Sequence, residues 1–293
     1  MWTEIVIAVG ILVGLGLSFA VVLAVANKQF WVYEDPRIDA VTDILPGTNC
    51  GACGEPGCHA FAESIVKGSA LPGKCTVSSA DGIEEIAEFL GVDAGKEEKR
   101  VARLQCAGGR MEDREKADYL GQKTCRELAV VHGGNKGCAW GCLGLADCER
   151  VCTFSSIKMN DNDLPVVNVE SCTACGDCVD ICPKDLFTIM PVSHKLIVQC
   201  KSLLEGELAQ EICSVACDAC ERCVADSVSG LIEMKNNLAV IDYSRNALSS
   251  PSSTWRCPTG AIQWVTGQQF QASSQPLFPL GRVEVLSDNK VSF

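Results

Sequence analysis

The sequence predicts a membrane-anchored α+β protein built from several small, cysteine-rich modules. The first observation behind this prediction is an uncharged apolar run of 22 residues, Ile5 to Ala26. The second is the presence of 20 cysteines in 293 residues, set against an aromatic content of only 6%. So few aromatic residues argue against one large hydrophobic core, and small modules usually compensate with covalent or metal links.

The apolar run is long enough to be a membrane helix, since 22 residues at about 1.5 Å each span about 33 Å. Ala24-Val25-Ala26 could instead end a cleaved signal peptide, but the preceding Met-Trp-Thr-Glu segment has no basic side chain. A buried core helix is the other alternative. We expect an uncleaved anchor over residues 1–28. Lys28 and Arg37 follow the run, so the positive-inside rule places the bulk of the chain on the cytoplasmic side of the inner membrane.

A first cysteine module is expected over residues 29–100, in which residues 29–44 are a linker and helices cover about 59–67 and 81–91. Its cysteines follow the spacing C-x2-C-x4-C-x16-C: Cys50, Cys53, Cys58 and Cys75. Glycines around the first three allow the backbone to take positive φ and to wrap a compact group. Four thiolates can bind zinc or a [4Fe–4S] cluster, and the closely spaced trio favours the cluster.

The run Cys172-x2-Cys175-x2-Cys178-x3-Cys182-Pro183 is the most specific pattern in the chain. It is the bacterial ferredoxin signature, in which the fourth cysteine ligates a neighbouring cluster. Disulfide frameworks do not require this spacing of cysteines. An irregular set, Cys138, Cys142, Cys148 and Cys152, precedes it.

Exchange of the fourth ligands predicts two [4Fe–4S] clusters in a ferredoxin-like α+β domain over residues 101–192, with a short strand within 164–169. One cluster would be held by Cys138, Cys142, Cys148 and Cys182, and the other by Cys172, Cys175, Cys178 and Cys152.

A degenerate copy of this domain is expected over residues 193–266. Cys217, Cys220 and Cys223 repeat the trio, and Cys257 precedes Pro258 as Cys182 precedes Pro183. The other ligand positions hold Ser227, Ala247, Ser250 and Ser253. Under the exchange rule these four belong to one lost cluster, so the four remaining cysteines would hold a single [4Fe–4S] cluster, the fourth in the chain. The alternative is that both clusters are lost and that zinc or nothing binds.

Four cysteines stay outside these quartets: Cys106, Cys125, Cys200 and Cys213. Cys125-x12-Cys138-x3-Cys142 matches Cys200-x12-Cys213-x3-Cys217 in spacing, which indicates two copies of one unit. In that register Cys213 could replace Cys220 as a ligand. Alternatively, the four are buried structural thiols. A polar tail is expected over residues 267–293.

Composition and motifs also limit the function. The net charge is −12 and no basic stripe is present, which disfavours nucleic-acid binding. An acidic surface suits a basic redox partner, and ordinary solubility explains it equally well. No nucleophile–base pair, phosphate loop or flavin motif occurs, so we expect an electron-transfer subunit without a complete active site of its own. A redox sensor, a cluster-assembly protein and a zinc-stabilised scaffold are the alternatives.

The chain resembles the B subunit of the Rnf complex and of the related Rsx complex over about residues 1–265. The resemblance rests on the N-terminal apolar run, the ferredoxin runs and two further stretches: Leu45-Pro46-Gly47-Thr48-Asn49-Cys50-Gly51-Ala52-Cys53-Gly54 with Gly57-Cys58, and Gly137-Cys138-Ala139-Trp140-Gly141-Cys142-Leu143-Gly144-Leu145. Such subunits relay electrons in a membrane complex that couples ferredoxin oxidation to NAD reduction and moves Na+ or H+. The resemblance therefore implies a soluble ferredoxin or a similar donor, and membrane and flavin-bearing partner subunits in the bilayer.

Overall fold

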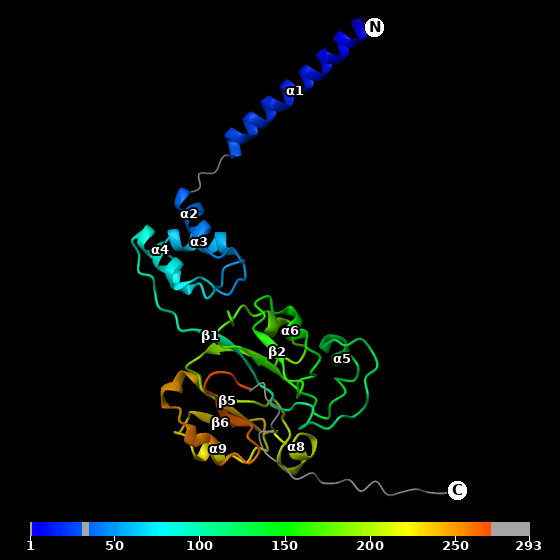
Figure 1. Ribbon diagram of the computed structural model, residues 1–293, viewed down its shortest axis with the longest axis vertical. Helices are drawn as coiled ribbons and strands as arrows, with labels where there is room; N and C mark the ends of the chain where they lie inside the picture. The colour runs from blue at the N-terminus through cyan, green and yellow to red at the C-terminus, as the bar shows by residue number, and fades with distance from the viewer. Residues whose placement is uncertain (1, 31–34, 271–293) are drawn as a thin grey trace, which may run out of the picture. The chain divides into compact units, whose positions relative to one another are not determined.

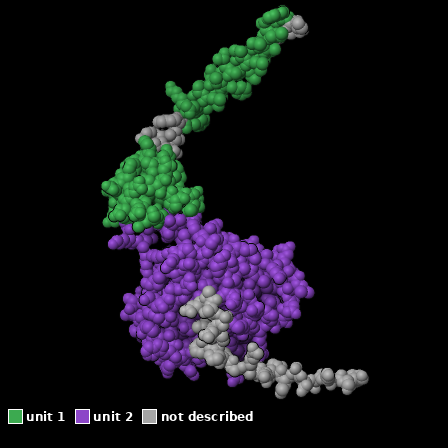
Figure 2. Space-filling model, viewed as in Figure 1, with its two compact units in different colours: residues 1–49, 55–72, 78–94 green, residues 50–54, 73–77, 95–293 purple. Residues whose placement is uncertain are grey.

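The computed structural model describes residues 2–30 and 35–270. The chain divides into two compact units (Figure 2). Unit 1 comprises residues 1–49, 55–72 and 78–94, and unit 2 comprises residues 50–54, 73–77 and 95–293.

The N-terminal apolar run forms the single long helix α1, Trp2–Phe30, which is drawn in dark blue in Figure 1. Its Ile5–Phe30 stretch is long and apolar enough to cross a membrane, and its side chains are not covered by protein. The one polar side chain of the predicted run, Ser18, donates to the Leu15 carbonyl at 2.7 Å. The helix thus satisfies its own polar groups, as a membrane span requires.

The rest of unit 1 is helical, with α2 (Pro36–Ile44), α3 (Cys58–Val66) and α4 (Ala80–Leu90). Both predicted helices are confirmed to within a residue or so, and α4 ends at Gly91 in the left-handed region. The prediction of a linker over 29–44 is wrong for its second part. Asp35 caps α2 by accepting from the Arg37 amide, and Pro36 fits the first turn of a helix.

In unit 2, module A is the set of elements from β1 to β4. Strand β1 (Arg100–Leu104) pairs antiparallel with β4 (Phe187–Pro191), and β2 (Ile157–Met159) pairs with β3 (Pro165–Val167). Between them lie the short helices α5 (Cys125–Val130), α6 (Asp147–Val151) and α7 (Asp177–Ile181). The strand predicted within 164–169 is confirmed as β3. The pairing of the first and last strands closes module A.

Module B, from β5 to β8, repeats this plan. Strand β5 (Leu196–Val198) pairs with β8 (Ile262–Trp264), and β6 (Ile232–Lys235) pairs with β7 (Leu238–Ile241). Its helical segments are α8 (Gly206–Ile212), α9 (Arg222–Ala225), η2 (Tyr243–Leu248) and η3 (Pro251–Thr254). The short 3-10 helix η1 (Pro72–Lys74) precedes both modules in the chain.

One hydrophobic core spans both modules. It joins Leu104, Leu164 and Phe187 of module A to Ala209 and Ala216, which lie in and beyond α8. A second, smaller cluster, which includes Leu231, Ile232 and Ile241, lies within module B.

The segment expected to be a free polar tail begins as part of the fold. Phe270 is buried in the shared core, and the Gln269 side chain accepts from the Leu104 amide at 2.8 Å. Arg103 donates to the Gly267 carbonyl at 2.6 Å. Residues 271–293 of the predicted tail lie outside the described residues.

Candidate iron–sulfur sites

Three loops of unit 2 share one unusual backbone shape. They run from Cys142 to Cys148, from Cys172 to Cys178 and from Cys217 to Cys223. In each loop the residues two and four positions after the first cysteine have positive φ: Gly144 and Ala146, Ala174 and Gly176, and Ala219 and Glu221. A left-handed conformation is strained for alanine and glutamate, and such strain collects at functional sites. The three loops are therefore copies of one binding loop.

The first thiol quartet, Cys152, Cys172, Cys175 and Cys178, lines a hollow of about 320 Å3 in module A. The structure thus brings together the four residues predicted for one cluster. The Ser156 amide donates to the Cys152 sulfur at 3.3 Å. Burial lowers the pKa of Arg103, and the negative charge of Cys172 opposes this shift. The guanidinium of Arg103 is 1% exposed, and its Nε and Nη2 have no partner among the described residues. A buried cation near these thiols fits a negatively charged occupant.

The second quartet of module A differs from the prediction in one member. Cys142, Cys148 and Cys182 line a hollow of about 340 Å3 together with Cys125 and not with Cys138. Leu145 stands where the other two loops carry their middle cysteine, so this loop lacks one thiol. Asp147 accepts from the Cys125 amide at 2.8 Å and thereby holds the start of α5 against the loop. The leucine is visible in the sequence, but nothing in the spacing identifies its distant replacement.

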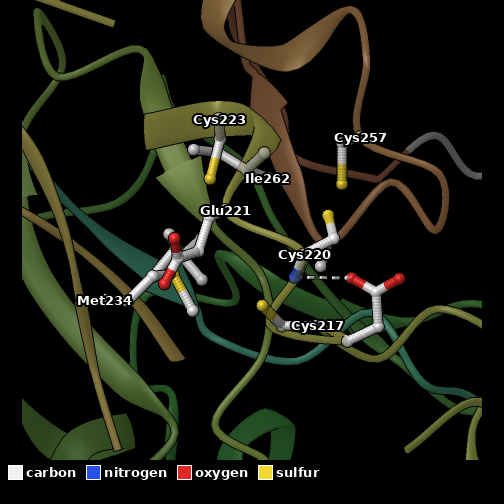
Figure 3. Close-up of a pocket in the computed structure, with 11 residues that line it drawn as sticks. Cys217, Cys220, Glu221, Cys223, Met234, Cys257 and Ile262 are labelled. Carbon is white, nitrogen blue, oxygen red and sulfur yellow. Dashed lines mark hydrogen bonds between the residues drawn. The ribbon is translucent and has the colours of Figure 1, made fainter. Parts of the chain in front are cut away.

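Module B contributes the quartet shown in Figure 3, which lines a hollow of about 330 Å3. Cys217 and Cys220 come from the loop, Cys223 from α9, and Cys257 from the segment before β8. All four are residues predicted for this site. Met234 and Ile262 give the hollow an apolar wall, and Asp218 accepts from the Cys220 amide at 3.3 Å.

Two of the four positions predicted to have lost their ligands make local side-chain hydrogen bonds, and the buried Ser253 hydroxyl has no partner among the described residues. The Ser227 hydroxyl donates to the Val224 carbonyl at 3.0 Å, and the Ser250 hydroxyl accepts from the Ser252 amide at 3.4 Å. Ser253 is buried at 1% exposure on η3, and Ala247 lies on η2. Here the polypeptide is held by serine hydrogen bonds and by packing.

Cys138 lies in a fourth hollow, of about 300 Å3, which the predicted quartets do not include. Its other thiols are Cys106, Cys200 and Cys213, three of the four cysteines that the sequence left unassigned.

The quartet Cys50, Cys53, Cys58 and Cys75 is supported by its spacing. Cys58 begins α3, and its amide donates to the Asn49 side chain at 2.8 Å. A Cβ on Gly57 would lie 2.9 Å from the same Asn49 oxygen, so glycine permits this turn.

The thiols of modules A and B line hollows. Among residues 2–30 and 35–270, no three His, Cys, Asp or Glu side chains are arranged to hold a single metal ion. Zinc would draw its thiolates to about 2.3 Å from one centre, whereas a cube of four irons and four sulfides separates them. Burial raises the pKa of Cys138 to about 11 and that of Cys148 and Cys223 to about 12. Binding therefore has to release thiol protons.

Comparison with protein families defines the class. The family described as "Putative Fe-S cluster" matches residues 45–77, the span of the first cysteine module's quartet. The family described as a 4Fe-4S binding domain matches residues 165–188, which contain the ferredoxin signature. Together with the mixed α/β modules and α1, these matches define an iron–sulfur protein with an N-terminal apolar helix.

Relatives identify the family. The chain is 43% identical over 245 residues to the B subunit of the Na(+)-translocating ferredoxin:NAD(+) oxidoreductase complex of Acetobacterium woodii, covering 84% of this chain and 74% of the relative. It is 34% identical to the B subunit of the ion-translocating oxidoreductase complex of Methanosarcina acetivorans, over 90% of this chain and 99% of that protein. It is 37% identical to the proton-translocating counterpart of Clostridium ljungdahlii, over 89% and 93% respectively. The chain belongs to the family of B subunits of ion-translocating ferredoxin:NAD oxidoreductase complexes.

Proposed function

We propose that this chain is a membrane-anchored electron relay. It accepts electrons singly from a low-potential donor such as reduced ferredoxin and passes them to membrane and flavin-bearing subunits of an ion-translocating complex. The observation that carries the proposal is the adjacency of two thiol quartets in module A. Cys178 of one and Cys148 of the other lie in the same buried cluster, and the charge of Cys148 contributes to the raised pKa of Cys178. Groups this close exchange electrons without a mobile carrier.

The residues that would hold [4Fe–4S] clusters follow from the hollows and from the spacing. The four sets are Cys50, Cys53, Cys58 and Cys75; Cys152, Cys172, Cys175 and Cys178; Cys125, Cys142, Cys148 and Cys182; and Cys217, Cys220, Cys223 and Cys257. When bound, each cluster supplies one-electron redox chemistry and requires no proton transfer. The chain positions the thiolates, donates amide hydrogen bonds to sulfur and limits the access of water.

The N-terminal helix supplies the anchor in this proposal, as a single pass that leaves both modules on the cytoplasmic side. Lys28 follows the apolar run, and thiolate–iron chemistry suits the reducing cytoplasm. On the same helix, a Cβ added at Gly10 or Gly14 would have nothing within 4 Å. A small-xxx-small pair of this kind allows a neighbouring subunit's helix to approach closely.

The test uses the full chain, purified in detergent without oxygen and mixed with reduced ferredoxin in a stopped-flow instrument. We expect the visible absorbance of the iron–sulfur clusters to bleach as ferredoxin is reoxidised, one electron per reduced cluster. A variant with Cys178→Ser should lose part of this amplitude, and a surface variant such as Lys235→Ala should keep it. A fully iron-loaded protein that exchanges no electrons with ferredoxin, and instead gives its clusters to an apo-acceptor, would be an assembly protein.

A further inference from the structure

We propose that Cys106, Cys138, Cys200 and Cys213 hold a fifth iron–sulfur cluster, built jointly by the two modules. All four thiols line one hollow of about 300 Å3, similar in size to the other three of unit 2. Cys106 and Cys138 come from module A, and Cys200 and Cys213 from module B. With this set, five quartets account for all 20 cysteines, each used once.

The two pairs occupy equivalent positions in the two modules. Cys106 follows the last residue of β1 by two positions, and Cys200 follows the last residue of β5 by two. Cys138 and Cys213 each precede the first cysteine of the binding loop by four positions. The register inferred from spacing, which matched Cys125 with Cys200, is thus replaced by one that matches Cys106 with Cys200. A long insertion, which carries Cys125, hides this register in module A.

The same hydrogen bond recurs in both halves of the site. The Cys142 amide donates to the Cys106 sulfur at 3.3 Å, and the Cys217 amide donates to the Cys200 sulfur at 3.3 Å. Amide donors to sulfur stabilise negative charge on iron–sulfur ligands. Cys142 and Cys217 themselves belong to the quartets of module A and module B. The fifth set is therefore joined to a quartet on either side.

Backbone hydrogen bonds between the modules hold the four cysteine segments in place. The Ala107 amide donates to the Gln199 carbonyl at 3.0 Å, next to Cys106 and Cys200. The segments around Asp113 and Cys213 form a bridge, in which the Ser214 amide donates to the Glu112 carbonyl at 3.0 Å. These bonds bring the cysteine segments of the two modules together without a ligand, and pre-organisation of this kind favours binding.

Charged side chains are buried close to these four thiols. Neutral thiols with a purely structural role would not need them. Lys136 is 5% exposed, and its ammonium donates to the Gly108 carbonyl at 3.1 Å. Asp113 is 7% exposed; its Oδ1 accepts from the Cys138 amide at 3.2 Å, and its Oδ2 has no partner among the described residues. Burying charges is costly unless a charged group nearby compensates. The Asp113 carboxylate offsets part of the Lys136 charge, and the thiolates of a bound cluster would add negative charge beside this ammonium, which also acts on Cys106.

Gly108 provides the space for this arrangement. A Cβ at this position would lie 2.8 Å from the Cys213 sulfur and 3.9 Å from the Cys106 sulfur. The backbone therefore approaches the thiols more closely than any other residue would allow. Its φ is not in the left-handed region, so alanine changes the space at the site and not the backbone preference.

A cluster at this position would link the two modules. One electron lost by a reduced cluster of module A would be gained here and then passed to module B, with no bond or proton changing. This consequence depends on the relay function, whereas the site itself does not.

The test is an iron, sulfide and zinc analysis of the full chain, purified without oxygen and fully loaded. Five clusters require about 20 irons per chain, and four require about 16. The variant Cys106→Ser/Cys213→Ser should lose about four irons and four sulfides relative to wild type. Ser214→Ala, which alters the side chain next to Cys213 and no thiol, should keep the wild-type count.

Gly108→Ala retains every thiol. It tests whether the iron lost from the double variant could be explained by loss of the fold. We expect it to bind fewer irons than wild type, while retaining the circular dichroism and melting behaviour of Ser214→Ala. About 16 irons in wild type, with none lost in the double variant, would overturn the proposal, and so would one zinc lost from that variant. A protein with about 20 irons that ignores ferredoxin would overturn the relay function alone.

Discussion

Modules A and B have the same strand pairing and the same binding loop but differ in how many thiol quartets they contain. Among the described residues, thiols of module A alone line two hollows and thiols of module B alone line one, and module B has serines or alanine at the positions predicted for a second set. The β6–β7 hairpin of module B nevertheless persists around buried Leu231, Ile232 and Ile241. The comparison teaches that the strand framework carries the fold of each module, and that it is present in module B without cysteines at the positions predicted for a second set.

Each module has a quartet whose last cysteine precedes a proline, and the surroundings of these two quartets differ as well. Cys182-Pro183 is followed by Lys184, whereas Cys257-Pro258 is followed by Thr259. The Lys184 ammonium lines the module A hollow and donates to the carbonyls of Gly133 at 2.6 Å and Ala139 at 2.7 Å. Burial lowers the pKa of Lys184, and the negative charge of Cys138 opposes this shift. Module B has a neutral side chain in this place.

The largest expected effect comes from removing the equivalent cysteines Cys148 and Cys223 in turn. Cys148 is part of the core that both modules share, and Cys223 belongs to the cluster confined to module B. Cys148→Ser should lose about four irons directly and further iron from the neighbouring quartet, with a marked fall in melting temperature. Cys223→Ser should lose about four irons and little else. Equal losses of iron and of melting temperature from the two variants would show that the place of Cys148 in the shared core adds nothing to the stability of its neighbours.

A second experiment restores the lost quartet of module B through Ser227→Cys, Ala247→Cys, Ser250→Cys and Ser253→Cys. If the framework survived the loss of the ligands, the variant should gain about four irons and four sulfides per chain. The single variant Ser253→Cys is the control and should gain none. An unchanged count in the quadruple variant would mean that η2 and η3 have changed the backbone beyond repair.

The sequence predicted those parts of the molecule whose structure depends on residues that are close together in the chain. The helix α1 and the strand β3 are encoded within short stretches. The position of Cys125 in the hollow of Cys142, Cys148 and Cys182 could not be predicted, because it depends on Asp147 holding α5 against a distant loop. The equivalence of Cys106 and Cys200 was hidden because it appears only when positions are counted from the ends of β1 and β5. The linker assignment missed α2 because the cap formed by Asp35 and Pro36 is short and precedes few apolar residues.

A smaller effect is expected from exchanging the residues that follow the two Cys-Pro pairs. A cation near a cluster stabilises its more negative, reduced state, so Lys184→Thr should lower the midpoint potential in module A. Thr259→Lys should raise that of module B. Redox titration followed by EPR measures both shifts, and iron content should stay at the wild-type value. A shift against the expected direction at either site would mean that the lysine acts through the backbone it holds and not through its charge. Equal shifts at both sites from one substitution would mean the same.

The smallest effect concerns one contact between the helical segments of each module. In module B, Arg256 and Asp226 form an ion pair with an Nε to Oδ2 distance of 2.7 Å, and the hydrogen bond from Arg256 lowers the pKa of Asp226. The equivalent positions in module A are Ile181 and Val151, counted back from Cys182 and Cys152. Exposed ion pairs contribute little and are screened by salt. Arg256→Ala should therefore lower the melting temperature only slightly, and the difference from wild type should shrink as salt increases.

Replacing the ion pair by the residues of module A tests whether the two contacts are interchangeable. The double variant Asp226→Val/Arg256→Ile removes both charges together, so neither is left unpaired, and it supplies apolar area in their place. We expect it to melt no lower than wild type, and any advantage over wild type should grow as salt screens the ion pair that wild type retains. If the melting temperature of the double variant were well below that of Arg256→Ala, α9 and η3 would meet in a different geometry from α6 and α7. The framework of module B would then have diverged together with its ligands.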